Sequence, residues 1–224
     1  MEKIIIKPQI HTNIKIDENI INIEPIIKPI FKNQRVFIIG GGPSLSNFNW
    51  NLLKDKNIIA INKAGEYLPF AQILYFSDLS FYINNKPLIR KFKNLIYTIK
   101  QLNDEDSKKV ISLKVTGLNG LELQNGSLRH GNNSGYAAIN LAVQLGANEI
   151  ILMGYDMSHD STKSHFHEGY TYCKADPNIY KKKFIDNFFT LVDPLKKMGI
   201  KIYNTSINSA LTCFPIVSIN NFLE

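Results

Sequence analysis

Three consecutive glycines follow a strongly apolar stretch, and they begin the first segment that could do chemistry. The segment reads Val-Phe-Ile-Ile-Gly-Gly-Gly-Pro-Ser over residues 36–44. Glycines allow sharp turns and close approach to a ligand, and a helix that starts just after them offers backbone N–H groups to an anion. The pattern therefore favours a nucleotide-binding turn, with a tight turn without ligand as the alternative; its residues are Gly40, Gly41, Gly42, Pro43 and Ser44.

This glycine turn departs from two well-known nucleotide-binding patterns. Leu45 stands where the dinucleotide fingerprint G-x-G-x-x-G requires its last glycine. The next apolar stretch is followed by Asn62, whereas dinucleotide enzymes place an acid there to bind a ribose. No Gly-Lys-Ser or Gly-Lys-Thr follows the turn, so the phosphate loop of many ATPases is also missing. The departures argue against an NAD enzyme.

A second polar segment stands at the start of a predicted apolar helix. It reads Asn133-Ser134-Gly135. These side chains and the helix N-terminus could hold a phosphate or a ribose. Alternatively, Asn133 or Ser134 only caps the helix, because both residue types are preferred at that position.

Two carboxylates follow predicted buried strands. Asp78 comes shortly after Ile73–Phe76, and Asp156 comes shortly after Glu149–Met153. Open α/β sheets bind ligands at the carboxyl ends of parallel strands, so both positions are candidate ligand contacts. Each carboxylate could instead cap a local turn.

Four histidines lie in polar stretches, namely His130, His159, His165 and His167. Imidazole titrates near neutrality, so a histidine on a loop facing a ligand could act as a general base. Alternation in an extended segment would put His165 and His167 on one side and Phe166 on the other, toward the core. Alternatively, His165 and His167 bind a metal ion together with a nearby Asp, or the histidines are exposed and inert.

The remaining sequence predicts the elements that would position these residues. Strands are expected at 35–39, 57–61, 73–76, 94–99, 110–113, 149–153 and 201–204, with helices at 47–54, 79–91, 134–145 and 178–198 and a loop at 116–133. Strands that alternate with helices imply an α/β fold: a single Rossmann-like, doubly wound, mainly parallel sheet with helices on both faces. This domain is expected over residues 34–224. Residues 1–33, which contain three prolines, are expected to form an N-terminal arm or edge hairpin.

Composition narrows the class of protein further. With 224 residues, 44% hydrophobic and 20% charged, the chain can bury a core and is not mainly disordered. Its net charge of +7 would favour an anionic substrate, but the basic residues are scattered, so nucleic acid is not indicated. Two cysteines, Cys173 and Cys213, exclude a disulfide framework. No apolar run approaches the ~20 residues of a membrane span, and we expect a cytoplasmic protein.

In this order, the motifs resemble the MptE-like superfamily, which includes motility accessory factors and an archaeal pterin diphosphokinase and is related to bacterial sialyltransferase family 42. The similarity covers about residues 35–215; its matching segments are 38–45, 61–63, 133–136, 145–156, 164–166 and 208–211. In the sialyltransferases the glycine-rich turn, the Asn after the next strand and the Ser-Gly pair hold a CMP-sugar, which implies this role for residues 40–44, Asn62, Ser134 and Gly135. The family turn usually has Asn where this chain has Gly41.

The resemblance implies a nucleotide-dependent transferase. We expect a glycosyltransferase that uses a CMP-sugar-like donor and an unknown acceptor, with His165 as first and His167 as second candidate for the general base, and Asp156 as the substitute if neither serves. One alternative is a diphosphokinase that uses ATP and Mg²⁺ on a pterin-like compound, with Asp78 and Asp156 as oxygen ligands. The other is a non-catalytic nucleotide-binding module. Related proteins often associate, so a homo-oligomer is expected; no cofactor is certain.

Overall fold

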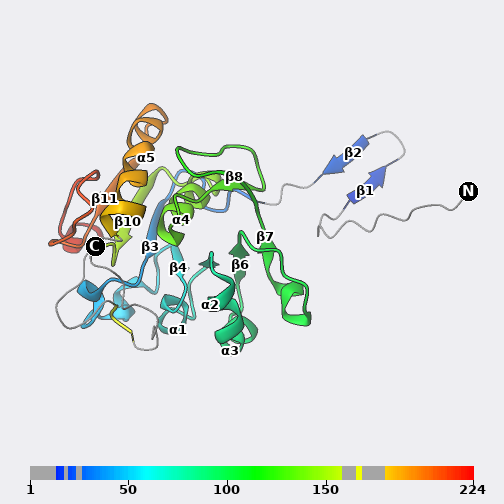
Figure 1. Cartoon of the computed structure of the whole chain (residues 1–224), viewed down its shortest axis with the longest axis horizontal. Helices are drawn as coiled ribbons and strands as arrows, with labels where there is room; N and C mark the ends of the chain where they lie inside the picture. Colours follow the sequence, from blue (N-terminus) through cyan, green and yellow to red (C-terminus); the bar gives the residue numbers. More distant parts are fainter. Residues whose placement is uncertain (1–13, 18–19, 24–26, 158–164, 168–179) are drawn as a thin grey trace, which may run out of the picture.

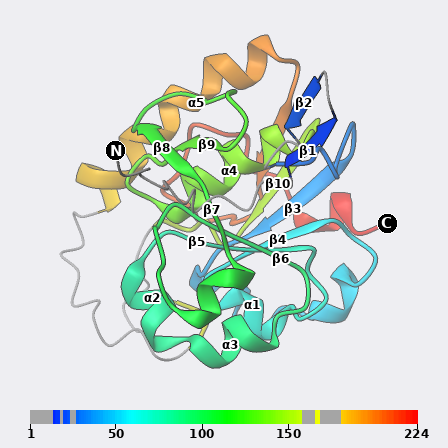
Figure 2. The ribbon, with the colours of Figure 1, turned by 90° about the vertical axis from the view of Figure 1, so that its right-hand side faces the viewer.

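The computed structural model describes residues 14–17, 20–23, 27–157, 165–167 and 180–224, and these form a Rossmann-like α/β fold. A parallel sheet runs through its centre in the order β11-β10-β3-β4-β5-β6-β7 (Figures 1 and 2). The strands are β3 (Arg35–Ile39), β4 (Ile58–Ile61), β5 (Ile73–Phe76), β6 (Leu95–Thr98), β7 (Ile111–Ser112), β10 (Glu149–Met153) and β11 (Lys201–Asn204).

The central strands are continuous apolar runs because both faces of the sheet are covered. Alternate strand residues pack into two separate cores. On one face they meet the helices α4 (Ser134–Gln144) and α5 (Asp186–Lys197). On the other they meet three 3₁₀ turns and the short helices α1 (Ala64–Tyr67), α2 (Leu79–Asn84) and α3 (Lys86–Lys91). The predicted fold class is therefore confirmed. Among the described residues, no helix has the length and apolarity needed to cross a bilayer.

Two predicted helices differ in the structure. Residues 47–54 hold no α-helix; 3₁₀ turns stand at Pro43–Leu45 and Trp50–Leu53. There the Asn49 side chain accepts a hydrogen bond from the Asn51 N–H (3.2 Å), a local contact that competes with a continuous helix. Residues 79–91 form α2 and α3 instead of one helix, because Pro87 lacks an N–H group and its ring excludes the carbonyl group four residues earlier.

The helix predicted at 178–198 lies within the described residues from Tyr180 onward. Its described part opens with a π-helical turn, Tyr180–Ile185, and continues as α5 to Lys197. Pro194 lies inside α5 and does not end it. The π-helical turn carries Phe184, which becomes relevant to the site below.

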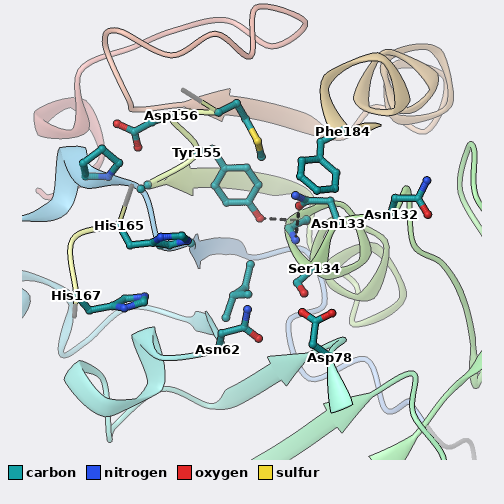
Figure 3. Close-up of a pocket in the computed structure, with 18 residues that line it drawn as sticks. Asn62, Asp78, Asn132, Asn133, Ser134, Tyr155, Asp156, His165, His167 and Phe184 are labelled. Carbon is teal, nitrogen blue, oxygen red and sulfur yellow. Dashed lines mark hydrogen bonds between the residues drawn. The ribbon is translucent and has the colours of Figure 1, made fainter. Parts of the chain in front are cut away.

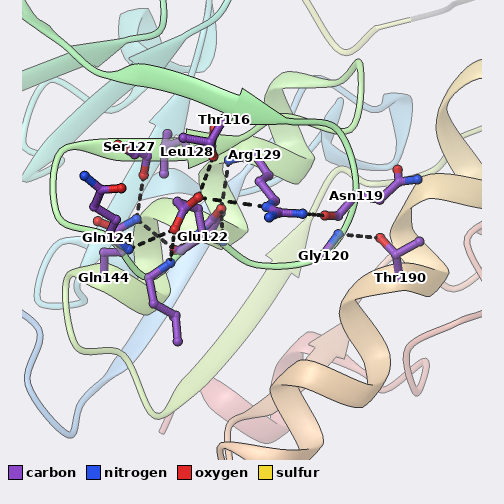
Figure 4. A network of polar contacts seen from close by, with 12 residues as sticks. Thr116, Asn119, Gly120, Glu122, Gln124, Ser127, Leu128, Arg129, Gln144 and Thr190 are labelled. Carbon is purple, nitrogen blue, oxygen red and sulfur yellow. Dashed lines mark hydrogen bonds and ion pairs between the residues drawn. The ribbon is translucent and has the colours of Figure 1, made fainter.

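The predicted loop at 116–133 contains a second, two-stranded parallel sheet. Its strands are β8 (Lys114–Gly117) and β9 (Ser127–Arg129), and the connection between them is fixed by polar side chains of the covering helices. Gln144 of α4 donates to the carbonyl groups of Glu122 and Ser127, and Thr190 of α5 accepts from the Gly120 N–H (Figure 4). Sequence reasoning missed these strands because their support comes from other elements.

Asn140 is the central member of this network. It is fully buried in α4. Its Oδ1 accepts from the backbone N–H groups of Glu122 and Arg129 (both 3.0 Å), and its Nδ2 donates to the Glu122 carbonyl oxygen (2.8 Å). One amide thus ties the β8–β9 connection to the helix whose first turn lies at the site.

Replacing Asn140 by Leu should therefore destabilise the protein strongly. The variant leaves two backbone N–H groups without an acceptor, and each such loss costs ~1–3 kcal/mol. For a chain of this size we expect the melting temperature to fall by roughly 4–24 °C. Thermal unfolding of Asn140→Leu beside Asn148→Ala, an exposed asparagine in the following turn, checks this. Equal melting temperatures for the two variants would contradict it.

The N-terminal segment divides into two parts. Residues Ile14–Asp17 (β1) and Ile20–Ile23 (β2) form an antiparallel hairpin that is separate from the central sheet (Figure 1). By contrast, Ile27 and Phe31 are buried in the core beside α4. The Phe31 N–H donates to the Leu145 carbonyl oxygen (2.8 Å). Ile27 and Phe31 thus belong to the packed core although they precede residue 34.

Candidate functional site

A pocket of about 300 Å³ lies at the point where the order of the sheet reverses. From β3 the chain builds β4 to β7 on one side, and then returns to place β10 on the other side of β3. The connections leaving the two strands diverge there, which opens a crevice at their carboxyl ends and makes it the usual ligand position in open α/β sheets. The lining residues are Gly40, Gly41, Gly42, Pro43, Ile61, Asn62, Asp78, Asn132, Asn133, Ser134, Gly135, Gly154, Tyr155, Asp156, Met157, His165, His167 and Phe184 (Figure 3).

The pocket brings together all the candidate nucleotide contacts except Ser44, together with Asp156, His165 and His167; Ser44 is exposed and does not line it. Ser44 donates from its Oγ to Asp156 (2.8 Å). Sequence reasoning missed several lining residues. Tyr155 and Gly154 are next to Asp156 in the chain, so adjacency could have suggested them. Phe184 had no signal, because only the packing of its distant segment brings it to the pocket.

The glycine turn packs against the end of β10. The Gly40 N–H donates to the Met153 carbonyl oxygen (2.8 Å), and the Gly42 N–H donates to the Gly154 carbonyl oxygen (2.9 Å). The Ser44 N–H donates to Asp156 Oδ1 (3.1 Å). With these groups engaged, and only a three-residue 3₁₀ turn following, the turn offers a ligand fewer N–H groups than the helix start that its sequence suggested.

The Asp156 carboxylate links the glycine turn to the segment that follows β11. Its carboxylate is buried and accepts three hydrogen bonds, from the Ser44 N–H, the Ser44 Oγ and the Ser206 Oγ (3.2 Å). Ser206 is held in turn by the Tyr155 N–H (3.1 Å). Asp156 therefore does not cap a local turn, and its carboxylate is already hydrogen-bonded within the protein. Ser206 follows β11, the strand beside β10, and sequence reasoning did not select it.

The start of α4 forms the opposite part of the pocket. Asn133 is its N-cap: Oδ1 accepts from the N–H groups of Gly135 (2.7 Å) and Tyr136 (3.2 Å). Asn133 therefore caps the helix and also lines the pocket. The Tyr155 hydroxyl donates to the Gly135 carbonyl oxygen (3.0 Å), which joins the helix start to the end of β10.

His165 and His167 both line the pocket, and Phe166 between them points away from it. The Phe166 N–H donates to the Gly41 carbonyl oxygen (3.0 Å), and its ring packs against Trp50 and Tyr67 at centroid distances of 5.3 and 5.1 Å. Residues 165–167 form a bend instead of the expected extended segment, and the Phe166 ring also contacts the His167 ring, with centroids 4.9 Å apart. The two imidazole rings lie 5.3 Å apart, measured between centroids.

The two carboxylates do not form one cation site. Asp78 follows β5 and Asp156 follows β10, and β3 and β4 lie between those strands. Three strand spacings amount to about 14 Å. Both oxygens of Asp156 already accept hydrogen bonds. Within the described ranges, no group of three His, Cys, Asp or Glu side chains is arranged to hold a metal ion. The shared Mg²⁺ site expected for a diphosphokinase does not fit these residues.

The other two candidate histidines take no part in the described pocket. His159 lies outside the described residues. His130 is partly buried just before α4, and its Nδ1 accepts from the Asn132 N–H (3.2 Å). Burial, and to a lesser degree the charge of Lys100, lowers the pKa of His130.

This lowered pKa predicts a loss of stability in acid. The folded protein prefers neutral His130, so its contribution is fully present above the unfolded pKa of about 6.5 and is lost as the pH falls through the folded value. We expect His130→Gln to unfold with a weaker pH dependence than the natural protein between pH 7.5 and pH 5. Chemical denaturation over this range measures the difference; parallel curves would show that His130 contributes nothing.

The fold and the pocket together define a Rossmann-like α/β protein with a candidate ligand site at its switch point. No model of a known protein family matches the chain, and no curated protein is significantly similar to it in sequence.

Proposed function

We propose that the protein is a nucleotide-dependent transferase, and specifically a glycosyltransferase that uses a CMP-sugar-like donor. The observation that carries the proposal is the composition of the switch-point pocket. It combines the glycine turn, Asn62 and the start of α4 with two histidines held at its edge. The first three are the positions that the resemblance to family 42 sialyltransferases assigns to the donor.

His165 is the proposed general base, with His167 second. A neutral imidazole accepts the proton of an acceptor hydroxyl while the acceptor oxygen forms a bond to the anomeric carbon. The bond from that carbon to the donor's phosphate oxygen breaks, and the nucleotide leaves with its electron pair. The Phe166 ring packs against Trp50 and Tyr67, and this contact holds the segment that carries the imidazole rings of His165 and His167. Asp156 is a positioning residue in this scheme, because its hydrogen bonds hold the glycine turn against β10.

A thermal-shift panel of nucleotides tests the proposal. CMP, CDP, UDP and CMP-sugars should raise the melting temperature without metal, because a ligand at 100 times its Kd stabilises the folded state by ~2.7 kcal/mol. For this chain length that corresponds to roughly 5–10 °C. The shift should weaken in Asn62→Ala, a pocket variant, and persist in Asn148→Ala, whose side chain is exposed away from the pocket.

The other outcomes of the panel contradict the proposal in different ways. Stabilisation by ATP only with Mg²⁺ would favour the diphosphokinase. Binding of a CMP-sugar without turnover toward any glycan, peptide or small-molecule acceptor would favour a non-catalytic module. If no nucleotide raised the melting temperature, the proposal of a nucleotide site would itself be wrong.

A further inference from the structure

The described residues that line the pocket include no Lys or Arg. Two of them, His165 and His167, can carry a positive charge, whereas Asp78 and Asp156 carry negative charges. Among the described lining residues, the positive charge open to a phosphate is that of the two imidazole rings, which lie beside the glycine turn.

Fewer backbone N–H groups are open to a phosphate in this pocket than is usual for this fold. Phosphates at a switch point normally bind the N–H groups of the glycine turn and of the next helix. Here the N–H groups of Gly40, Gly42 and Ser44 already donate within the protein. At the start of α4, those of Gly135 and Tyr136 donate to Asn133. A side-chain donor that supplements the remaining N–H groups of these segments, such as those of Gly41 and Ser134, would strengthen phosphate binding.

The two rings are packed directly on the turn. A Cβ atom at Gly41 would lie 2.8 Å from His165 Cδ2 and 3.4 Å from His167 Nε2, so the missing side chain makes the space that the imidazoles occupy. The Phe166 N–H bond to Gly41 holds their segment there. Two imidazolium ions with centroids 5.3 Å apart repel each other, so the pair accommodates one positive charge more easily than two.

We propose that His165 and His167, seated on Gly41, form the phosphate-binding subsite of the pocket. One protonated ring binds a phosphoryl oxygen of the nucleotide, and the other stays neutral and available to accept a proton. This assignment rests on the proposed nucleotide-dependent function, to which it adds the place and the partners of the ligand's phosphate.

Isothermal titration with three probes tests the subsite: inorganic pyrophosphate, CDP and cytidine. The double variant His165→Gln/His167→Gln should bind pyrophosphate and CDP at least tenfold more weakly, while its affinity for cytidine should change less than twofold. Gly41→Ala retains both imidazoles but displaces them, and it should show the same selective loss. Lys183→Gln removes an exposed charge beside the lining residue Phe184 and should bind like the natural protein.

The outcomes separate the subsite from the proposed function. If the double variant binds CDP and pyrophosphate as tightly as the natural protein, the subsite is wrong and a nucleotide site remains. An equal loss of cytidine and CDP would also overturn it, because the defect would then not concern the phosphate. If the natural protein binds pyrophosphate through the histidines but no nucleotide or nucleoside, the subsite stands and the proposed function fails.

Discussion

His165→Ala is expected to lower kcat by roughly 10²–10⁴-fold with little change in donor affinity. Removal of a general base costs about this much, since the acceptor hydroxyl must then lose its proton without help. His167 remains in the variant and can still carry the charge that binds phosphate, so Kd for the donor changes much less than kcat. Steady-state turnover and donor titration on the same preparation measure the two effects separately.

A variant of His167 and a double variant of both histidines test whether the loss of turnover is due to His165. His167→Ala should have the smaller effect on kcat if the ranking of the two rings is correct. The double variant His165→Ala/His167→Ala should lose both turnover and phosphate-dependent binding. If it keeps full turnover, the base lies elsewhere and the assignment is wrong. Asp156 would then be the next residue to test, although its carboxylate already accepts bonds from Ser44 and Ser206.

Gly42→Ala should reduce both stability and nucleotide binding. The backbone at Gly42 is ordinary extended chain (φ −62°, ψ 149°), which any residue adopts, so the effect is purely one of space. An added Cβ would lie 1.8 Å from Asp156 Oδ2 and 2.6 Å from the Gly154 carbonyl oxygen. The carboxylate must move and its bonds to Ser44 must break. Overpacking of this kind costs ~1–3 kcal/mol or more.

We therefore expect Gly42→Ala to melt roughly 4–12 °C lower than the natural protein and to bind CDP at least tenfold more weakly. Gly117→Ala is the matched control, because a Cβ there meets only Arg129 side-chain atoms at ordinary contact distance, 3.9 Å or more. Differential scanning calorimetry and titration compare the two. Similar behaviour of both variants would show that the packing of the turn on Asp156 does not govern the pocket.

The sequence by itself determined the layered sheet and most of the pocket's lining. Apolar runs such as Val-Phe-Ile-Ile mark strands whose two faces are both covered, and this is a local pattern. Candidate residues from the ends of different strands then meet because parallel strands carry their carboxyl ends to one edge of the sheet. His165 and His167 both reach the pocket as expected, although their segment is a bend and not an extended chain.

Only the tertiary structure decided which of these groups are available to a ligand. The N–H groups of Gly40 and Gly42 are engaged because β10 returns beside β3, a contact between residues more than 100 positions apart. The same long-range packing makes Asp156 a cross-link to Ser206 and separates it from Asp78. Hydrogen-bond partners and distances of this kind depend on how distant elements pack, whereas local residue patterns determine only the elements themselves.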